Sequence, residues 1–274
     1  MKCIDFDKQF ERYTTEWVKK NAAKYKNNMD VIEMMMPDIY MQFLQKPAAW
    51  LDGAAPETYF ERYDDAAMLI EWMCEYYAQK IPVPDLLLER IAELGEPAEA
   101  GLLALLDDQR GEEAEMTAIS LLREMESEKP MARYVALIAS QESPDEKADM
   151  CAEALVGMGT AAVEPILAAL PEATQAARDI FADILSNYPG DERIFNLLME
   201  RFAYAADKRA LFASYLAKYG DDRALEALYA AAQDDHVNYL DYVEIVNAID
   251  ALGGERPAER EFSGDPYYES LKHV

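Results

Sequence analysis

Residues 152–167 read AEALVGMGTAAVEPIL, and this stretch decides the fold class. An Ala-rich apolar run ends at Met158-Gly159, and a second apolar run begins after Thr160. Glycine accepts the left-handed conformation in which many helices end, and Thr can cap the first turn of the next helix. The stretch therefore predicts two helices joined by a short turn.

The same turn recurs along the last two-thirds of the chain. The turns are Leu94-Gly95, Met158-Gly159, Pro189-Gly190, Tyr219-Gly220 and Leu252-Gly253. Successive glycines lie roughly 30 residues apart, except for a double interval between Gly95 and Gly159, so one turn is missing, near Glu126. A fixed period of this size is typical of solenoids, in which each unit buries its apolar face against its neighbours. We therefore predict an all-α fold, an α-α superhelix of antiparallel helix pairs.

The starts of the second helices follow from helix-capping chemistry. We expect these helices to begin at Pro97, Pro130, Thr160, Asp191 and Asp221. Proline suits the first helical turn, where its missing N–H had no partner, and Asp or Thr can accept a hydrogen bond there. One first helix has a similar signal, because Ser143 and Glu146 have the spacing of a capping box around Pro144.

The repeats divide the chain into three regions. Residues 81–253 hold the predicted repeats, residues 1–80 form a divergent N-terminal helical capping region, and residues 254–274 form a polar tail. The tail is either an ordered arm or loose. Near the N-terminus four aromatic residues share one helical face, which either docks on the repeats or recruits a partner. They are Phe6, Phe10, Tyr13 and Trp17.

The charge is strongly negative and unevenly distributed. The chain of 274 residues has a formal net charge of -27. Residues 1–29 hold seven Lys/Arg and four Asp/Glu, a net of +3, so the remainder carries -27 - 3 = -30. Such a surface repels phosphate backbones and anionic lipids. We expect no nucleic-acid partner and no membrane partner; the acidity serves solubility or a basic protein partner.

The cysteines and the N-terminus indicate a reducing cytoplasm. Cys3, Cys74 and Cys151 are odd in number and far apart, which gives no disulfide framework. Acidic residues stand where a signal peptide needs an apolar stretch, and no apolar run approaches the length of a membrane span.

The repeat pattern resembles a known family. Residues 145–170 are similar to a HEAT-like repeat of the type named after phycobilisome lyases: an Ala-rich helix ending in Leu-Gly, a short second helix and an acidic turn. Asp107-Asp108 and Asp234-Asp235 stand where the acidic turn belongs. The resemblance covers residues 81–253 and implies an α-solenoid whose second helices line the concave side. It implies little about chemistry, because this repeat serves scaffolds, adaptors and a few enzymes.

Catalytic and metal-binding motifs are absent from the sequence. It contains no His-Glu-x-x-His, no Gly-x-Ser-x-Gly and no phosphate-binding glycine loop. Its two histidines, His236 and His273, do not make a zinc-site pattern with three scattered cysteines. We therefore expect no catalytic residues, no metal and no cofactor.

A weak signal marks a binding patch on the second helices. Alignment of these helices by their turns places Phe195, Met199 and Tyr229 on the side away from the core stripe. Their expected polar neighbours are Asn196, Glu226 and Glu164. A partly apolar patch of this kind could bind a peptide or helix. Alternatively, these side chains fill the seam between adjacent helix pairs.

These observations favour a non-enzymatic scaffold or adaptor that binds a peptide, helix or partner domain in a concave groove. One alternative is an enzyme on a HEAT-like scaffold. A DNA glycosylase-like activity needs a basic groove, which the charge opposes, and a chromophore-lyase-like activity is suggested only by the name of the repeat. A further alternative is an acidic mimic of nucleic acid that binds a DNA-binding protein.

Overall fold

The structure is a computed structural model that describes residues 2–25, 28–108, 110–143, 145–258 and 260–271. Within these ranges every regular element is a helix, and neighbouring helices pack in pairs. The predicted all-α helical repeat fold is confirmed. The helices form two compact units, residues 1–127 and 128–274. The boundary lies inside the predicted repeat region, and the tail belongs to the second unit.

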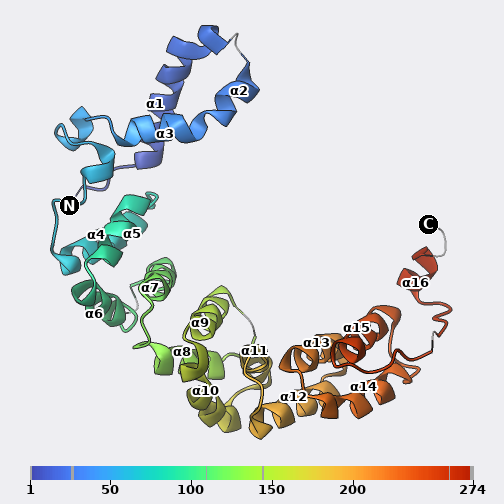
Figure 1. Cartoon of the computed structure of the whole chain (residues 1–274). Coiled ribbons are helices and arrows are strands. Elements are labelled where there is room, and N and C mark those ends of the chain that lie inside the picture. The colour runs from blue at the N-terminus through green and yellow to red at the C-terminus, as the bar shows by residue number, and fades with distance from the viewer. Residues whose placement is uncertain (1, 26–27, 109, 144, 259, 272–274) are drawn as a thin grey trace. The chain divides into compact units, whose positions relative to one another are not determined.

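The first unit contains the N-terminal helices. They are α1 (Phe6–Asn21), α2 (Met29–Met34), α3 (Met36–Leu44), α4 (Ala66–Ala78), α5 (Asp85–Glu93), α6 (Glu96–Leu105) and α7 (Glu112–Glu124) (Figure 1). Short 3-10 helices lie between them: η1 (Ala22–Tyr25), η2 (Ala49–Leu51) and η3 (Pro56–Thr58). α4 packs against α5, α6 and α7. Asp5 caps α1, because its carboxylate accepts a hydrogen bond of 2.8 Å from the Lys8 backbone N–H.

The aromatic face of α1 docks inside this unit. The ring centroids of Phe6 and Trp50 lie 5.2 Å apart, edge to face. Phe10 and Tyr13 lie 5.3 and 5.6 Å from Phe43 of α3. Such aromatic pairs fix the orientation of α1 on α3 and on the turn that follows it.

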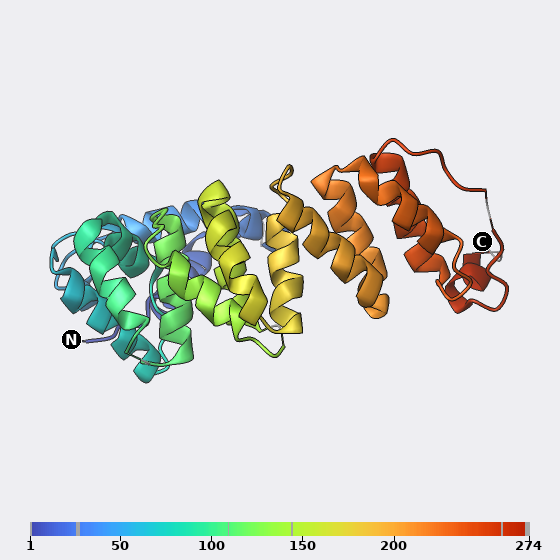
Figure 2. The same cartoon turned by 90° about the horizontal axis from the view of Figure 1, so that it is seen from below.

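The second unit contains two layers of helices. It comprises α8 (Met131–Ala139), α9 (Glu146–Gly157), α10 (Val163–Ala169), α11 (Gln175–Leu185), α12 (Glu192–Tyr204), α13 (Arg209–Tyr219), α14 (Leu225–Ala232), α15 (Tyr239–Ala251) and α16 (Pro266–Leu271), with the 3-10 helices η4 (Gly159–Ala162), η5 (Leu170–Glu172), η6 (Ala206–Lys208) and η7 (Asp222–Ala224). In Figure 1, α9, α11, α13 and α15 form one layer and α10, α12 and α14 the other. Figure 2 shows that successive helices of this unit lie side by side.

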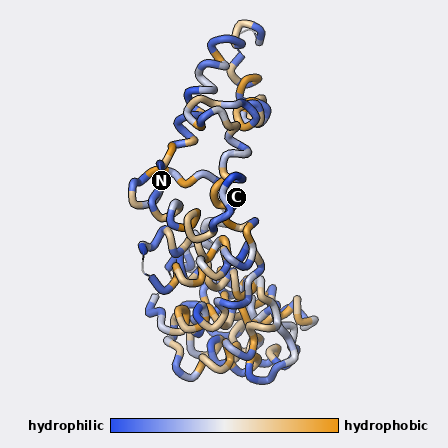
Figure 3. Tube along the Cα trace, turned by 90° about the vertical axis from the view of Figure 1, so that its left-hand side faces the viewer, coloured by the Kyte–Doolittle hydropathy of each residue, from blue (hydrophilic) through white to orange (hydrophobic). Residues whose placement is uncertain are grey.

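Within each unit, the helices of the repeats bury one apolar face against their neighbours. Hydrophobic and hydrophilic segments alternate along the trace in Figure 3, as amphipathic helices require. In the second unit Leu155, Ile166, Leu198 and Leu228 have no exposed surface. They come from α9, α10, α12 and α14, so both layers contribute to the core.

The predicted caps at Asp191 and Asp221 are confirmed. Their carboxylates accept hydrogen bonds from the backbone N–H groups of Arg193 and Arg223, at 2.8 and 3.0 Å. The predicted helix start at Thr160 is wrong, because Thr160 lies in η4 and makes no capping bond, and α10 begins only at Val163.

The start of α9 also differs from the prediction. Asp145 caps this helix in place of Ser143, since its carboxylate accepts a hydrogen bond of 2.7 Å from the Ala148 N–H. Pro144, the centre of the predicted capping box, lies outside the described residues.

The turn that the glycine pattern lacks is present in the structure. The glycines of the predicted turns have φ values between 63° and 102°. At the missing position Glu126 has φ 54°, in the left-handed region. Glu126 lies close to the midpoint between Gly95 and Gly159, one period from each. The period is therefore unbroken, but a residue with a side chain here adopts a conformation that costs about 1–2 kcal/mol.

The described part of the tail is ordered against α14 and α15. The Arg260 guanidinium donates hydrogen bonds of 2.9–3.1 Å to the carbonyl oxygens of Ala232, Asp234 and Val237. The Asp265 carboxylate accepts a hydrogen bond of 3.0 Å from the Tyr239 N–H. The ordered-arm alternative thus holds for residues 254–258 and 260–271 of the tail; His273 lies outside the described residues.

We predict that Glu126→Gly stabilises the protein by about 0.5–1 kcal/mol. The change relieves left-handed strain of about 1–2 kcal/mol, and the added freedom of the unfolded chain offsets part of that gain. The Glu126 side chain is exposed, so little else is lost. The measurement is the free energy of unfolding in urea. Gly220→Ala is the matched control: at φ 80° it should cost about 1 kcal/mol. A destabilised Glu126→Gly variant would contradict the argument.

Candidate functional site

The structure places the predicted patch residues in different surroundings. Phe195 is buried, with 7% of its surface exposed, and the Arg223 guanidinium lies 4.2 Å from its ring centroid. Met199 and Tyr229 are half-buried, and the Tyr229 hydroxyl donates a hydrogen bond of 2.8 Å to the Glu255 carbonyl oxygen. Phe195 therefore fills a seam between helix pairs, and the tail holds Tyr229.

The polar neighbours of the predicted patch are exposed. Asn196 and Glu226 are open to solvent, and Glu164 lies beside Arg193. No observation tests binding at the six patch residues, so a partner contact there stays a prediction.

Two arginines bridge successive second helices. Arg193 contacts Glu164 at 2.5 Å and Asp191 at 2.6 Å. Arg223 contacts Glu192 at 2.9 Å and Asp221 at 2.7 Å. Each guanidinium therefore joins the capping Asp of its own helix to an acid of the preceding second helix. The hydrogen bond from Arg193 holds the pKa of Glu164 below its usual value.

Sequence reasoning missed these bridges, although a signal was present. The pattern Gly-Asp-x-Arg occurs at residues 190–193 and again at residues 220–223, one period later. The pairs are exposed and screened by water, so they contribute little to stability. The carboxylates of Glu164, Asp191, Glu192 and Asp221 therefore already have arginine partners.

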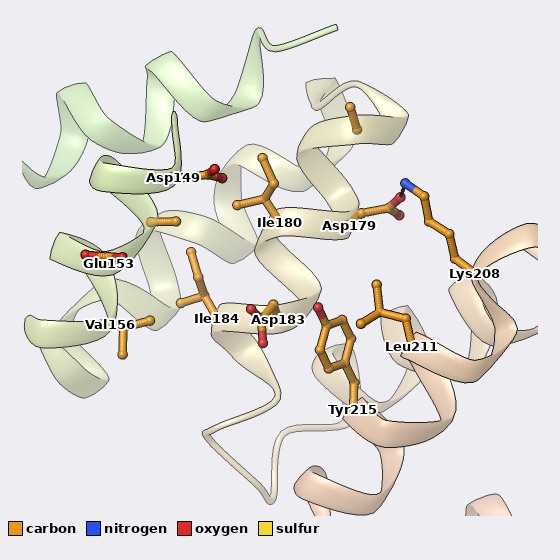
Figure 4. Close-up of a pocket in the computed structure, with 12 residues that line it drawn as sticks. Asp149, Glu153, Val156, Asp179, Ile180, Asp183, Ile184, Lys208, Leu211 and Tyr215 are labelled. Atoms are coloured by element: carbon orange, nitrogen blue, oxygen red, sulfur yellow. Dashed lines mark hydrogen bonds and ion pairs between the residues drawn. The ribbon is translucent and has the colours of Figure 1, made fainter. Parts of the chain in front are cut away.

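A hollow opens on the layer of helices that contains α9, α11, α13 and α15. It has a volume of about 580 Å³ and lies between α9, α11 and α13 (Figure 4). The family resemblance implied that second helices line the concave side of the solenoid, whereas this hollow is lined by first helices. The first helices α9, α11 and α13 line it, and the small side chains of Ala152 and Ala176 leave space between the larger ones.

The hollow combines an apolar floor with an acidic rim. Val156, Ile180, Ile184 and Leu211 supply the apolar surface. Val156 and Leu211 are 44% and 41% exposed, high values for large aliphatic side chains. The carboxylates that line the hollow are those of Asp149, Glu153, Asp179 and Asp183. A ligand here would meet exposed hydrocarbon beside the exposed carboxylates of Asp149 and Asp183.

Asp179 is the best-buried of these acids and binds two cations. Its side chain is 12% exposed and lies 2.7 Å from Arg201 and 2.6 Å from Lys208. Arg201 is itself buried. Sequence analysis missed this cluster, but Arg201 stands between Leu198 and Phe202 at core spacing, which signals a buried ion pair.

Tyr215 supplies a hydrogen-bond donor to the hollow. Burial, together with the nearby charges of Asp183 and Asp179, raises the pKa of Tyr215 to about 12. The phenol is therefore protonated at neutral pH. Its hydroxyl lies on the side of Asp183 in Figure 4 and has no hydrogen-bond partner among the described residues. The Asp183 carboxylate lies 3.4 Å from Lys218, and both side chains are exposed.

Comparisons with protein-family models, with curated proteins and with solved structures find no match. Among the described residues no group of three or more His, Cys, Asp and Glu could hold a metal ion. None of the described helices is long and apolar enough to cross a membrane.

The Cys151 thiol is fully buried, which raises its pKa to about 12 and keeps it protonated.

We predict that Arg201→Gln lowers the free energy of unfolding by about 2–4 kcal/mol. The change removes one partner of a buried ion pair and leaves Asp179 with Lys208 alone. Urea unfolding measures the effect. Arg193→Gln is the control: this side chain is 54% exposed, and its loss should lower the free energy of unfolding far less than Arg201→Gln does. Equal effects for the two variants would show that the Asp179 cluster does not support the fold.

Proposed function

We propose that this protein is a non-enzymatic scaffold or adaptor, built of HEAT-like repeats, that binds a cationic amphipathic helix or peptide. The hollow between α9, α11 and α13 is the proposed binding surface. The observation that supports this most directly is the exposure of Val156 and Leu211 inside a rim of carboxylates. Binding would remove these side chains from water, which is favourable by about 25 cal/mol per Å² of apolar surface.

The shape and charge of the hollow fit one recognised mode of peptide binding. An amphipathic helix presents apolar residues at intervals of three and four, and a groove between helices accepts that face. Its Lys or Arg residues would then approach Asp149 and Asp183, which are exposed. The Tyr215 hydroxyl could donate to a carbonyl oxygen of the ligand. The net charge of -30 beyond residue 29 would also speed association with a basic partner.

The enzyme alternatives receive less support from the hollow. A DNA glycosylase-like protein needs cations along its groove to neutralise phosphates, and here Lys208 already binds Asp179. A chromophore-lyase-like activity finds no supporting contact. The cytoplasm stays the expected compartment, and the burial of free Cys74 and Cys151 is compatible with it.

The test is a titration of the full chain against a fluorescein-labelled helical peptide with Leu on one face and Lys on the other. We expect saturable binding. The double variant Val156→Ser/Leu211→Ser should weaken it about tenfold, since a loss of about 1.4 kcal/mol of apolar burial corresponds to that factor. Both side chains are more than 40% exposed, so the fold should survive.

Matched controls separate this site from general stickiness. Tyr204→Ser removes a side chain on α12 that is 80% exposed and lies outside the hollow, and it should leave affinity unchanged. A peptide with Glu in place of Lys should not bind. Equal binding of the two peptides, or equal weakening by Tyr204→Ser, would refute the proposal.

A further inference from the structure

A smaller pocket in the first unit has the opposite charge. Its volume is about 280 Å³, and it lies between α1, the C-terminal end of α3 and η2. The side chains that matter below are Arg12, Tyr13, Phe43, Lys46 and Trp50, and Glu16 also lines it. This volume is just under the lower limit of about 300 Å³ for pockets that hold drug-sized ligands. It suits one ring or one to two amino-acid side chains.

Two cations flank this pocket without an acidic partner. Arg12 and Lys46 are exposed, and neither forms an ion pair within the described part of the chain. The Lys46 Nζ lies 5.0 Å from the centroid of the Tyr13 ring. The one acid that lines the pocket, Glu16, lies 4.0 Å from Lys20 on the next turn of α1. Arg12 and Lys46 thus give the lining of this pocket two bases and one acid, Glu16.

The walls of the pocket are aromatic and well supported. Trp50 is half-buried, stacks on Phe43 with centroids 6.2 Å apart, and meets Phe6 edge-on at 5.2 Å. Tyr13 packs on Phe43 from the side of α1. These contacts hold the rings in place before a ligand arrives, which lowers the entropic cost of binding.

We propose that this pocket binds a carboxylate attached to an aromatic or apolar group. The carboxylate would lie between Arg12 and Lys46, because a guanidinium pairs with a planar carboxylate through two parallel hydrogen bonds. The apolar part would lie against Trp50 and Tyr13. Inorganic phosphate would satisfy the cations but leave the aromatic walls uncovered. The site differs from the hollow of the proposed function in both its unit and its charge preference.

The carboxylate could come from a free aryl acid or from a peptide. The experiment therefore has two arms on the full-length protein: benzoate, and acetyl-Glu-Phe-amide. The readout is the NMR signal of the Trp50 indole N–H, assigned with Trp50→Phe. We expect a saturable shift with millimolar affinity in at least one arm. Saturation by benzoate alone identifies a free aryl carboxylate, and saturation by the peptide identifies a peptide-borne one.

Matched compounds and variants make the outcome decisive. Arg12→Gln/Lys46→Gln should weaken binding at least about tenfold, equivalent to about 1.4 kcal/mol. Lys8→Gln/Lys19→Gln changes the net charge equally at two exposed residues of α1 outside the pocket, and it should have no effect. The proposal is overturned if neither ligand shifts the signal, or if benzamide and acetyl-Gln-Phe-amide bind as well. It is also overturned if phosphate binds as well, or if the Lys8/Lys19 control loses as much affinity.

Discussion

The repeat architecture depends on one residue with a positive φ angle after each first helix. This residue lets the chain reverse within a few peptide units, so that the next helix can cover the apolar face of its predecessor. Gly159 and Gly220 do this without strain, because no Cβ meets the preceding carbonyl. At Glu126 the same backbone conformation is imposed on a residue that resists it. The interior of the first unit must therefore outweigh the local preference at that position.

The two helix layers of the second unit differ in how their carboxylates are paired with basic side chains. On the second helices, Arg193 and Arg223 occupy the carboxylates that lie between successive pairs. On the first helices, Asp179 takes two cations, while Asp149 remains exposed at the rim of an open hollow. One layer is therefore closed by its own ion pairs. The other layer also pairs Asp179 and Asp183 with bases, but it keeps the exposed Asp149 beside uncovered hydrocarbon, which is the combination that a cationic amphipathic ligand requires.

The fold was predictable because its signals are local. Glycine spacing and the caps at Asp191 and Asp221 act within a few residues of where they occur in the chain. The candidate site was not predictable in the same way. Phe195 is covered by Arg223, which belongs to the next helix pair along the chain, and no helical periodicity encodes that contact. Glu126 carries no turn signal of its own: the glycine spacing predicted a missing turn near it, and its φ angle shows that the turn is made there.

The tail covers the surface of the second unit on which a further helix pair would pack, so it affects where helix pairs can be added. Arg260 donates hydrogen bonds to carbonyl oxygens at the C-terminal end of α14. Phe262 packs against Tyr242 of α15, with ring centroids 5.0 Å apart. The segment after Gly253 thus occupies surface that a following second helix would otherwise cover. Duplication of an internal helix pair would leave this closure intact, whereas elongation beyond Gly253 would first have to displace it. Growth of the array by evolution or by engineering is therefore easier from within than at this end.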